Sequence, residues 1–482
     1  MPDEKPMHID GAWVPASGNR TYEVVSPVDG SVLAAVAKAT RDDAANAVAA
    51  AERAFRDPAW RRMDPSERGR LLQRAALIAR ERADEIARLE STNQGKPLRE
   101  AKADVLFAIA TLEYYAGLAD KIEGGVIPVS GPRFAYTLRE PLGPTVHIIP
   151  WNYPFQLGVR SVAPALAAGN TVVAKPASQT PLTFLVLAEI FEKAGFPKGV
   201  FNVVTGSGSE AGAALAADGR VRGVVLTGSV ETGQKLLAET ARNLVPTTLE
   251  LGGKSPNIVF PDADLDKAVK GAAFGIFLNA GQMCWAGSRL LLHESIHDAF
   301  VEKLAAFAKT WKLGNPLEKD TRMGPLVSKE HRERVESYVA VAEKEGAKLV
   351  LGGKRPEDPA LAAGAFYGPT IFTDVAPAST LAREEVFGPV LAVMKFKDET
   401  DALRLANGVD FGLYAGVWTK DLARAHRVAA DLESGQVAVN EYPVTFPQVP
   451  FGGLKRSGLG SEQGLSALEF YTRRKSVMMN LG

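Results

Sequence analysis

Two kinds of hydrophobic spacing alternate along this chain, and together they predict an α/β protein. Apolar residues recur at helical spacing over residues 42–56 and 65–90, and the second stretch opens with Asp64 and Pro65, a capping residue and a first-turn residue. From about residue 144, the short apolar runs PTVHII, NTVVAK, GVFNVVTG and RGVVLTG alternate with helical stretches at 154–168, 181–194, 208–217 and 229–242. This alternation is typical of βαβ units and predicts a parallel sheet.

A second α/β region follows Leu251 and extends to about residue 455. Its apolar runs are SPNIVF, SRLLLH, AKLVLGG, VLAVMKF and QVAVN, with helical stretches between them. The pattern therefore predicts two sandwiched α/β lobes. The segments RFAYTLREP and KSVMMN are short and strand-like, and we expect them to lie outside both lobes, where they could pair with each other.

Composition and charge limit the kinds of partner. The chain has 482 residues, of which 46% are hydrophobic, and its 56 basic residues balance 56 acidic ones. That is enough for a large core and more than one domain. Because no basic run is long, we expect a small-molecule partner and neither nucleic acid nor membrane. The N-terminal residues lack the apolar core of a signal peptide, and no run of about 18 apolar residues occurs, so we expect a cytoplasmic protein.

The single cysteine, Cys284, cannot form an intramolecular disulfide, which agrees with a reducing compartment. It lies in FLNAGQMCWAGSR, where Gly281 and Gly287 free the backbone to form a pocket. A structural cysteine more often lies inside an apolar run, but lone cysteines are also common packing residues. The local sequence leaves both roles open.

Two other polar residues are candidates for chemistry. Glu250 ends the apolar strand of PTTLELGGKSP, and sites in α/β sheets form at the carboxyl ends of strands; the alternative is a solvated strand end. Asn152 lies between Pro150 and Pro154, which fix the backbone and therefore the direction of the amide. A rigid amide can donate to an oxyanion, although the residue taken by itself is better explained as an ordinary turn asparagine.

Glycine-bearing turns follow the strands after Lys175, which ends the run NTVVAKP. These turns are GSGSEAG (206–212) and LTGSVETG (226–233). Such turns let backbone amides and helix N-termini approach phosphates. The first has the form GxGxxxG, one residue longer than the usual dinucleotide motif, so it predicts a phosphate site only together with its neighbours.

Residues 293–297 read HESIH and match the HExxH pattern of zinc proteases. That motif needs both histidines on one helix, whereas RLLLHE has the pattern of a strand that ends at His293, and a new helix is expected after it. His293 and His297 are therefore predicted to lie on different elements, and we expect no metal site.

Seven segments resemble the signature series of the aldehyde dehydrogenase superfamily, in order and with similar spacing over nearly the whole chain: PWNYP, VVAKPASQTP, LTGSVETG, LELGGKSP, NAGQMCWAGSR, EEVFGPV and PFGGLKRSG. The resemblance implies an α/β fold with parallel-rich sheets: a Rossmann-like cofactor lobe (1–122 and 142–252), a catalytic lobe (253–455) and a small β oligomerisation ribbon (123–141 and 456–482). It also implies a homodimer or homotetramer.

The same resemblance implies oxidation of an aldehyde to its carboxylic acid with NAD or NADP, through a thiohemiacetal and a thioester. Cys284 would be the nucleophile, Glu250 the general base that activates water, and Asn152 the oxyanion donor. The cofactor would bind along Ile149, Trp151, Lys175, Ser178, Gly208, Gly228, Ser229, Leu251, Glu385 and Phe387.

The resemblance assigns Tyr153, Leu157, Arg160 and Phe451 to the aldehyde tunnel. Arg160 follows Asn152 by eight residues, about two helical turns. Its guanidinium could bind a carboxylate or hydroxyl of the substrate, or form a salt bridge within the protein. Semialdehydes, hydroxyaldehydes and aromatic aldehydes therefore all remain open.

Ser178 stands where many NAD-preferring relatives carry a glutamate, which indicates that NADP is at least tolerated. Two other functions remain as alternatives: a coenzyme A-acylating aldehyde dehydrogenase and a catalytically silent, structural member of the fold. The carboxylate of Glu250 favours hydrolysis over transfer to coenzyme A.

Overall fold

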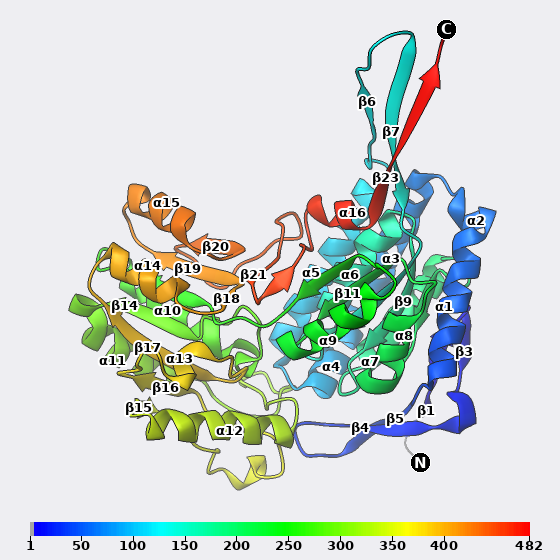
Figure 1. Cartoon of the computed structure of the whole chain (residues 1–482). Coiled ribbons are helices and arrows are strands. Elements are labelled where there is room, and N and C mark those ends of the chain that lie inside the picture. The colour runs from blue at the N-terminus through cyan, green and yellow to red at the C-terminus, as the bar shows by residue number, and fades with distance from the viewer. Residues whose placement is uncertain (1–3) are drawn as a thin grey trace.

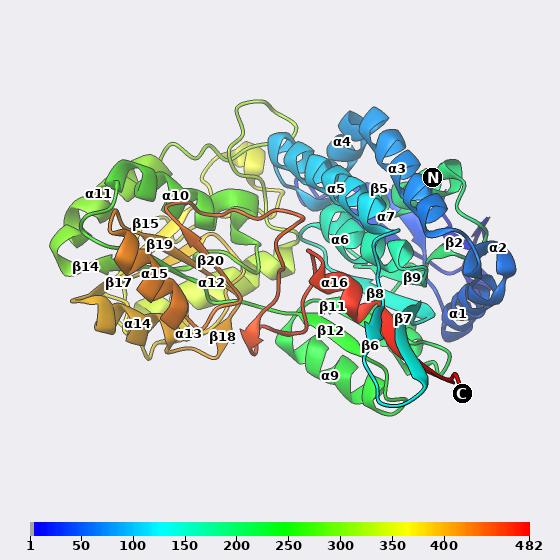
Figure 2. The same cartoon turned by 90° about the horizontal axis from the view of Figure 1, so that it is seen from above.

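The computed structural model describes residues 4–482 and consists of two α/β lobes joined side by side, with a narrow ribbon that projects from the first lobe (Figure 1). Seen from above, the two lobes lie beside each other and the chain passes between them more than once (Figure 2). The predicted α/β architecture with two lobes and parallel-rich sheets is confirmed.

The sheet of the first lobe has the strand order β22-β12-β11-β8-β9-β10-β2-β3. Its central strands are parallel, so the carboxyl ends of β8, β9, β11 and β12 meet at one edge, with Thr227 paired to Glu250 there. The strands at the two sides, β2, β3 and β22, are antiparallel. The strand bounds are β2 (Met7–Ile9), β3 (Ala12–Val14), β8 (Pro144–Ile149), β9 (Thr171–Pro176), β10 (Phe201–Val203), β11 (Gly223–Thr227), β12 (Thr247–Glu250) and β22 (Gly458–Leu459).

Helices cover both faces of this sheet. Successive residues of β9 therefore pack against helices on opposite faces. On β9, Val172 and Ala174 pack against helices α3 to α7, whereas Val173 packs against α1, α8 and α9. This alternation with apolar residues on both faces is expected of a buried parallel strand. The helices are α1 (Arg41–Arg56), α3 (Pro65–Glu81), α4 (Ala83–Gln94), α5 (Leu98–Leu118), α6 (Pro154–Ala167), α7 (Leu182–Ala194), α8 (Ala213–Ala217) and α9 (Val230–Ala241).

The helical stretch expected over residues 65–90 is wrong in one respect, because it is two helices that meet at Arg82. Arg82 leaves the helical path at φ −100° and ψ 11°, ending α3 and preceding α4. Its guanidinium forms ion pairs with Glu85 at 2.6 Å and Glu189 at 2.9 Å. The apolar spacing continues across the break, so the sequence pattern alone could not show it.

The second lobe is built on a sheet of order β15-β16-β17-β14-β13-β19-β20, antiparallel only where β15 pairs with β16. Its strands are β13 (Pro256–Val259), β14 (Arg289–His293), β15 (Lys348–Leu351), β16 (Thr370–Thr373), β17 (Val390–Phe396), β19 (Tyr414–Trp418) and β20 (Gln436–Val439). The helices around it are α10 (Leu265–Phe277), α11 (His297–Ala308), α12 (Lys329–Lys344), α13 (Thr380–Arg383), α14 (Glu399–Asn407) and α15 (Leu422–Asp431).

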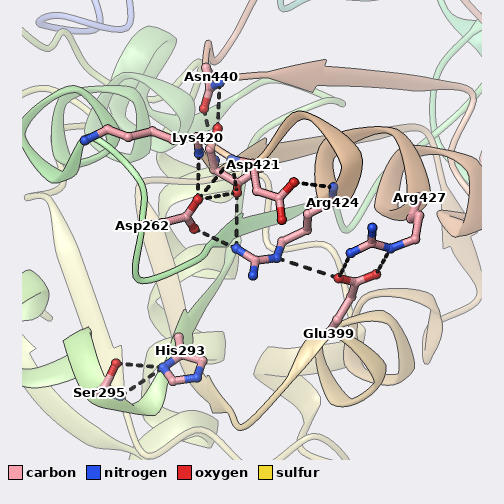
Figure 3. Close-up of polar contacts among 10 residues, drawn as sticks. Asp262, His293, Ser295, Glu399, Lys420, Asp421, Arg424, Arg427 and Asn440 are labelled. Carbon is pink, nitrogen blue, oxygen red and sulfur yellow. Dashed lines mark hydrogen bonds and ion pairs between the residues drawn. The ribbon is translucent and has the colours of Figure 1, made fainter.

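Asp262 ties the loop before α15 to this lobe (Figure 3). Its carboxylate accepts hydrogen bonds from the backbone N–H of Lys420 at 2.8 Å and Asp421 at 3.1 Å, and from the Arg424 guanidinium at 2.7 Å. Three donors on one carboxylate fix the start of the helix relative to β13.

The HESIH segment has the arrangement that the sequence predicted. His293 ends β14 and its Nδ1 contacts the Ser295 hydroxyl at 2.8 Å (Figure 3), whereas His297 begins α11. In residues 4–482, no group of three or more His, Cys, Asp and Glu side chains is arranged to hold a metal ion. No helix in this part of the chain is long and apolar enough to cross a bilayer.

The ribbon consists of β6 (Gly125–Ile127), β7 (Arg133–Pro141) and β23 (Thr472–Asn480). β23 pairs antiparallel with β7 over its whole length, from Thr472 opposite Pro141 to Asn480 opposite Arg133. RFAYTLREP and the C-terminal strand therefore pair outside both lobes, and Figure 1 shows them extending away from the body.

Smaller elements connect the lobes. β1 (Glu4–Lys5), β4 (Thr21–Val25) and β5 (Val32–Ala37) form a separate sheet, and β18 (Phe411–Gly412) pairs with β21 (Leu454–Lys455). After β21, the chain returns to the first lobe through β22 and α16 (Ser466–Phe470). Through this return, Gly458 and Leu459 pair with Glu250 and Leu249 at the carboxyl end of β12. The remaining short helix, α2 (Pro58–Arg61), follows α1.

Candidate active site

Cys284 lies where two cavities meet. The larger cavity, of about 390 Å³, and the smaller one, of about 30 Å³, both have Cys284 in their walls. Burial raises the pKa of the Cys284 thiol to about 12, while the positive charge of Arg160 opposes this increase. A thiol at this junction can contact a molecule in either cavity, but it must lose its proton to act as a nucleophile.

Glu250 is the last residue of β12, and its side chain is enclosed, with 1% of the residue exposed. Neither carboxylate oxygen has a hydrogen-bond partner among residues 4–482. Burial raises the pKa of Glu250 well above its usual range, and the Arg160 guanidinium opposes this effect. The same carboxylate contributes to the raised pKa of Cys284, so the two groups interact. A carboxylate with a raised pKa and no hydrogen-bond partner is a stronger base than an ordinary glutamate and can accept a proton.

Asn152 precedes α6 and is held by the loop that carries Cys284. Its Nδ2 donates a hydrogen bond to the carbonyl oxygen of Gln282 at 3.0 Å. Asn279 Nδ2 in turn donates to the carbonyl oxygen of Asn152 at 3.0 Å. A primary amide has two N–H donors, so this bond fixes the Asn152 side chain and leaves its second N–H for another acceptor.

All ten residues that the sequence assigned to the cofactor line the larger cavity, at the carboxyl ends of the strands of the first sheet. They are Ile149, Trp151, Lys175, Ser178, Gly208, Gly228, Ser229, Leu251, Glu385 and Phe387. The structure therefore brings strand ends, glycine turns and a distant segment around residue 385 to one place. Sites of open α/β sheets are expected at this edge.

Two polar side chains of this cavity, Lys175 and Ser178, contact backbone carbonyl groups. Lys175 Nζ donates to the carbonyl oxygens of Pro176 at 2.9 Å and Gly206 at 3.1 Å, and the Ser178 hydroxyl donates to Gly206 at 3.0 Å. Burial lowers the pKa of Lys175 to about 8. The N-terminus of α9 opens into the cavity at Ser229, which caps it. An ammonium group, a hydroxyl and a helix N-terminus suit a ligand that carries ribose and phosphate groups.

Among the wall residues of the larger cavity that were not predicted from the sequence, two come from a helix of the second lobe. His331 and Arg334, both on α12, lie in its wall. His331 contacts the carbonyl oxygen of Phe387 at 2.7 Å, and its ring lies edge-on to Trp151 at 5.2 Å. The pattern of α12 is that of an ordinary amphipathic helix, so no local signal distinguished these side chains.

The smaller cavity contains all four residues that the sequence assigned to the aldehyde: Tyr153, Leu157, Arg160 and Phe451. The sequence analysis missed the other side chains of its wall, which are Gln156, Trp285, Thr445 and Gln463. Three aromatic rings and an arginine therefore line this narrow cavity.

Arg160 forms a buried ion pair with Glu462, and both residues are at most 3% exposed. The guanidinium also donates to the Thr227 hydroxyl at 3.3 Å and lies 5.0 Å from the centre of the Phe451 ring. Burial opposes the charge of Arg160, but the carboxylates of Glu462 and Glu250 raise its pKa, so it stays protonated. Of the two roles left open for Arg160, the salt bridge within the protein is present in the structure.

Comparisons with known proteins show the family of this chain. The profile of the aldehyde dehydrogenase family matches residues 13–477. The chain is 45% identical over 475 residues to the betaine aldehyde dehydrogenase of Bacillus subtilis (strain 168), covering 98% of this chain and 97% of that protein. It is also similar to the crystal structure of betaine aldehyde dehydrogenase from Staphylococcus aureus in complex with NAD+, with a TM-score of 0.98, 40% identity, and coverage of 99% of this chain and 95% of that one. The chain thus belongs to the aldehyde dehydrogenase family and is an oxidoreductase that oxidises aldehydes with NAD or NADP.

Proposed function

We propose that Cys284 is the nucleophile of this oxidation, Asn152 the oxyanion donor and Glu250 the general base, and that water rather than coenzyme A accepts the acyl group. The observation that carries the proposal is the position of Cys284 in the walls of both cavities. A sulfur at this junction can hold an aldehyde in the smaller cavity while the larger one holds the electron acceptor.

In the first step, the Cys284 thiol gives up its proton to solvent water, and Sγ adds to the aldehyde carbonyl carbon, whose oxygen takes the electron pair as the thiohemiacetal forms. The second amide N–H of Asn152 and the backbone N–H of Cys284 are the donors for the developing oxyanion, each contributing about 3 kcal/mol. The nicotinamide of the bound cofactor supplies the hydride acceptor, and a thioester remains on Cys284. Glu250 then takes a proton from water, and the resulting nucleophile releases the carboxylic acid.

The larger cavity suits the cofactor because Lys175 and Ser178 there have backbone contacts that they can exchange for contacts with a ligand. We assign Lys175 and Ser178 to the adenosine ribose, the N-terminus of α9 at Ser229 to the pyrophosphate, and Glu385 with Phe387 to the nicotinamide half. Since Ser178 brings no negative charge, NADP should be used as well as NAD.

The substrate is, in our proposal, a small uncharged aldehyde, either aromatic or hydroxylated. The charge of Arg160 is already balanced by Glu462. Two of the three aromatic rings of the cavity already face a cation: Lys96 Nζ lies 3.8 Å from the centre of the Tyr153 ring, and Arg160 lies over Phe451. Rings that already face a cation are poor partners for a second one, so betaine aldehyde should be a weak substrate here. Carboxylated semialdehydes lack a free cation to bind.

A panel assay tests this assignment. Benzaldehyde, lactaldehyde, succinate semialdehyde, hexanal and betaine aldehyde are compared by kcat/KM, each with NAD and with NADP, with and without coenzyme A. We expect benzaldehyde or lactaldehyde to exceed the charged substrates by at least about tenfold, with no dependence on coenzyme A. A preference for betaine aldehyde would contradict the substrate class, and acyl-coenzyme A formation would contradict hydrolysis.

We further propose a homodimer or homotetramer assembled through the ribbon. Val126 and Met478, on β6 and β23, are 69% and 78% exposed, and Phe134 on β7 is 39% exposed. Apolar side chains gathered on a projecting ribbon favour association with another copy. Light scattering of the purified protein measures the assembly. A cytoplasmic location is part of the same proposal, because a reducing compartment keeps the Cys284 thiol free, and cell fractionation tests it.

A further inference from the structure

The turn before Cys284, residues 279–281, has a left-handed backbone conformation that residues other than glycine rarely adopt. Asn279, Ala280 and Gly281 follow one another at φ values of 47°, 53° and 74°. Asparagine adopts the left-handed region occasionally, but it is unfavourable for alanine, so contacts from outside the turn must hold Ala280 and its neighbour Asn279 there.

One such contact comes from the other lobe. The backbone N–H of Asn279 donates to Glu100 Oε2 at 2.7 Å. Glu100 lies in the first turn of α5, its side chain is 11% exposed, and its neighbour Arg99 donates to the carbonyl oxygen of Thr321 at 2.7 Å in the second lobe. The first turn of α5 therefore docks on the second lobe, and Glu100 is its buried contact to the turn.

The same turn holds two of the proposed catalytic residues, Asn152 and Cys284, in place. Asn279 Nδ2 donates to the carbonyl oxygens of Asn152 at 3.0 Å and Gln282 at 3.3 Å, and the Asn152 amide donates to the same Gln282 oxygen. Cys284 follows Gln282 by two residues. A displacement of Asn279 would therefore move the oxyanion amide and the nucleophile relative to each other.

The turn is also closely packed on its other side. A Cβ at Gly281 would lie 2.1 Å from the carbonyl oxygen of Gly388, which follows the segment of Glu385 and Phe387 in the larger cavity. The turn has no space to shift in that direction. Its position is thus set by the segment around Gly388 on one side and by Glu100 on the other.

We infer that Glu100 is a positioning residue: from the first lobe, its carboxylate holds the left-handed turn 279–281 of the second lobe, and so keeps Asn152 and Cys284 in their working arrangement. This inference rests on the proposed roles of those two residues. The essential feature of the Glu100 side chain is an oxygen that accepts the hydrogen bond of the Asn279 backbone N–H.

The first test compares Glu100→Ala, which removes the acceptor, with Glu100→Gln, which keeps one. Glu100→Ala should lower kcat by about tenfold or more with little change in KM for the cofactor, because small displacements of reacting groups have large effects. Glu100→Gln should stay within about threefold of wild type. Glu113→Ala is the matched control, since Glu113 is on the same helix but pairs only with Arg80 in a solvent-exposed salt bridge.

The second readout needs no aldehyde. Because Cys284 is the single cysteine, its rate of alkylation by iodoacetamide reports the surroundings of this thiol alone. The rate should change in Glu100→Ala and not in Glu100→Gln. Should Glu100→Ala fail to fold, Glu100→Leu, which fills the space without an acceptor, replaces it. If the wild-type enzyme forms no acyl adduct on Cys284, the proposed function fails, whereas the alkylation rates still test the hold of Glu100 on the turn.

A rescue separates positioning from general loss of structure. Ala280→Gly makes the left-handed conformation easier to adopt, so in the Glu100→Ala background it should restore part of kcat. A double variant no more active than Glu100→Ala would contradict the role of the turn. Values of kcat within twofold of wild type in Glu100→Ala, or equal losses in the Ala and Gln variants, would overturn the assignment.

Discussion

The two cavities that meet at Cys284 are built in different ways. The larger one, about 390 Å³, is formed by strand ends and glycine turns of the first sheet, with Glu385 and Phe387 from the second lobe. The smaller one, about 30 Å³, is formed by side chains from three separate parts of the chain, near residues 155, 285 and 450. The larger cavity is therefore a property of the fold, whereas the smaller one depends on individual side chains.

The charged groups of the two cavities also differ in whether their contacts can be exchanged for contacts with a ligand. Lys175 and Glu385 contact backbone groups in the larger cavity, and these contacts can be exchanged for contacts with a ligand. In the smaller cavity Arg160 is paired with Glu462. The larger cavity is therefore suited to a charged, polar cofactor, and the smaller one to an aldehyde without charge.

The largest effect should come from the residue that the cavities share. Cys284→Ala should lower aldehyde oxidation by about 10⁴-fold or more, because no other group can form the thioester. Cofactor binding, followed by fluorescence titration, should remain, since the larger cavity keeps the rest of its wall. A variant that still turns over at an easily measured rate would show that the covalent mechanism is wrong.

Glu250→Gln should divide the reaction into a fast and a slow part. Steady-state kcat should fall by about 10²- to 10³-fold, while the first release of NADH changes little, because the base is needed only for hydrolysis. Stopped-flow absorbance measures both phases. Normal steady-state rates would remove Glu250 from the mechanism.

The pH dependence follows from the raised pKa of Glu250. A general base acts when deprotonated, so a raised pKa shifts the rise of activity to higher pH. The kcat of the wild-type enzyme should therefore increase with pH over a range that lies above the usual titration range of a glutamate. Glu250→Gln should lose this dependence, and an unchanged profile in the variant would assign the increase to another group.

A smaller effect is expected from a substitution that changes only the charge balance of the smaller cavity. Glu462→Gln frees the charge of Arg160, so kcat/KM for succinate semialdehyde relative to benzaldehyde should increase by about tenfold or more, the value of a charged hydrogen bond. Adding Arg160→Leu should abolish this gain. An unchanged ratio in Glu462→Gln would mean that Arg160 does not face the substrate.

The smallest expected effect concerns the choice between NAD and NADP. Ser178→Glu places a carboxylate beside the proposed ribose site, so kcat/KM with NADP should fall by about tenfold relative to NAD, through repulsion of the 2′-phosphate. Ser178→Ala is the control, because it removes the hydroxyl without adding charge. Equal changes with both cofactors would place Ser178 outside the ribose site.

The two cavities were also unequally predictable from the sequence. Lys175, Gly208 and Gly228 lie at strand ends or in glycine turns, and parallel strands bring such places together, so their convergence in the larger cavity follows from the βαβ pattern. The pairing of Arg160 with Glu462 joins positions about 300 residues apart, and nothing in either local pattern indicates it.

Other features of the site could not be predicted from the sequence, because they depend on contacts between distant segments or have no local pattern. His331 and Arg334 face the larger cavity from a helix with ordinary spacing, so only the packing of α12 against the first lobe reveals them. The bond between Asn152 and Gln282 joins two turns 130 residues apart. The left-handed backbone at Ala280 has no sequence signal, because alanine is a residue that usually avoids it.

The most direct test of the account is the mass of the trapped intermediate. Glu250→Gln is mixed with benzaldehyde and NAD, quenched in acid within seconds, and analysed by intact mass and by mapping of the peptide that contains Cys284. The account predicts one benzoyl group per chain, located on Cys284, and no adduct in Cys284→Ala treated in the same way. NADH formation without any adduct on Cys284, or with an adduct at another residue, would contradict it.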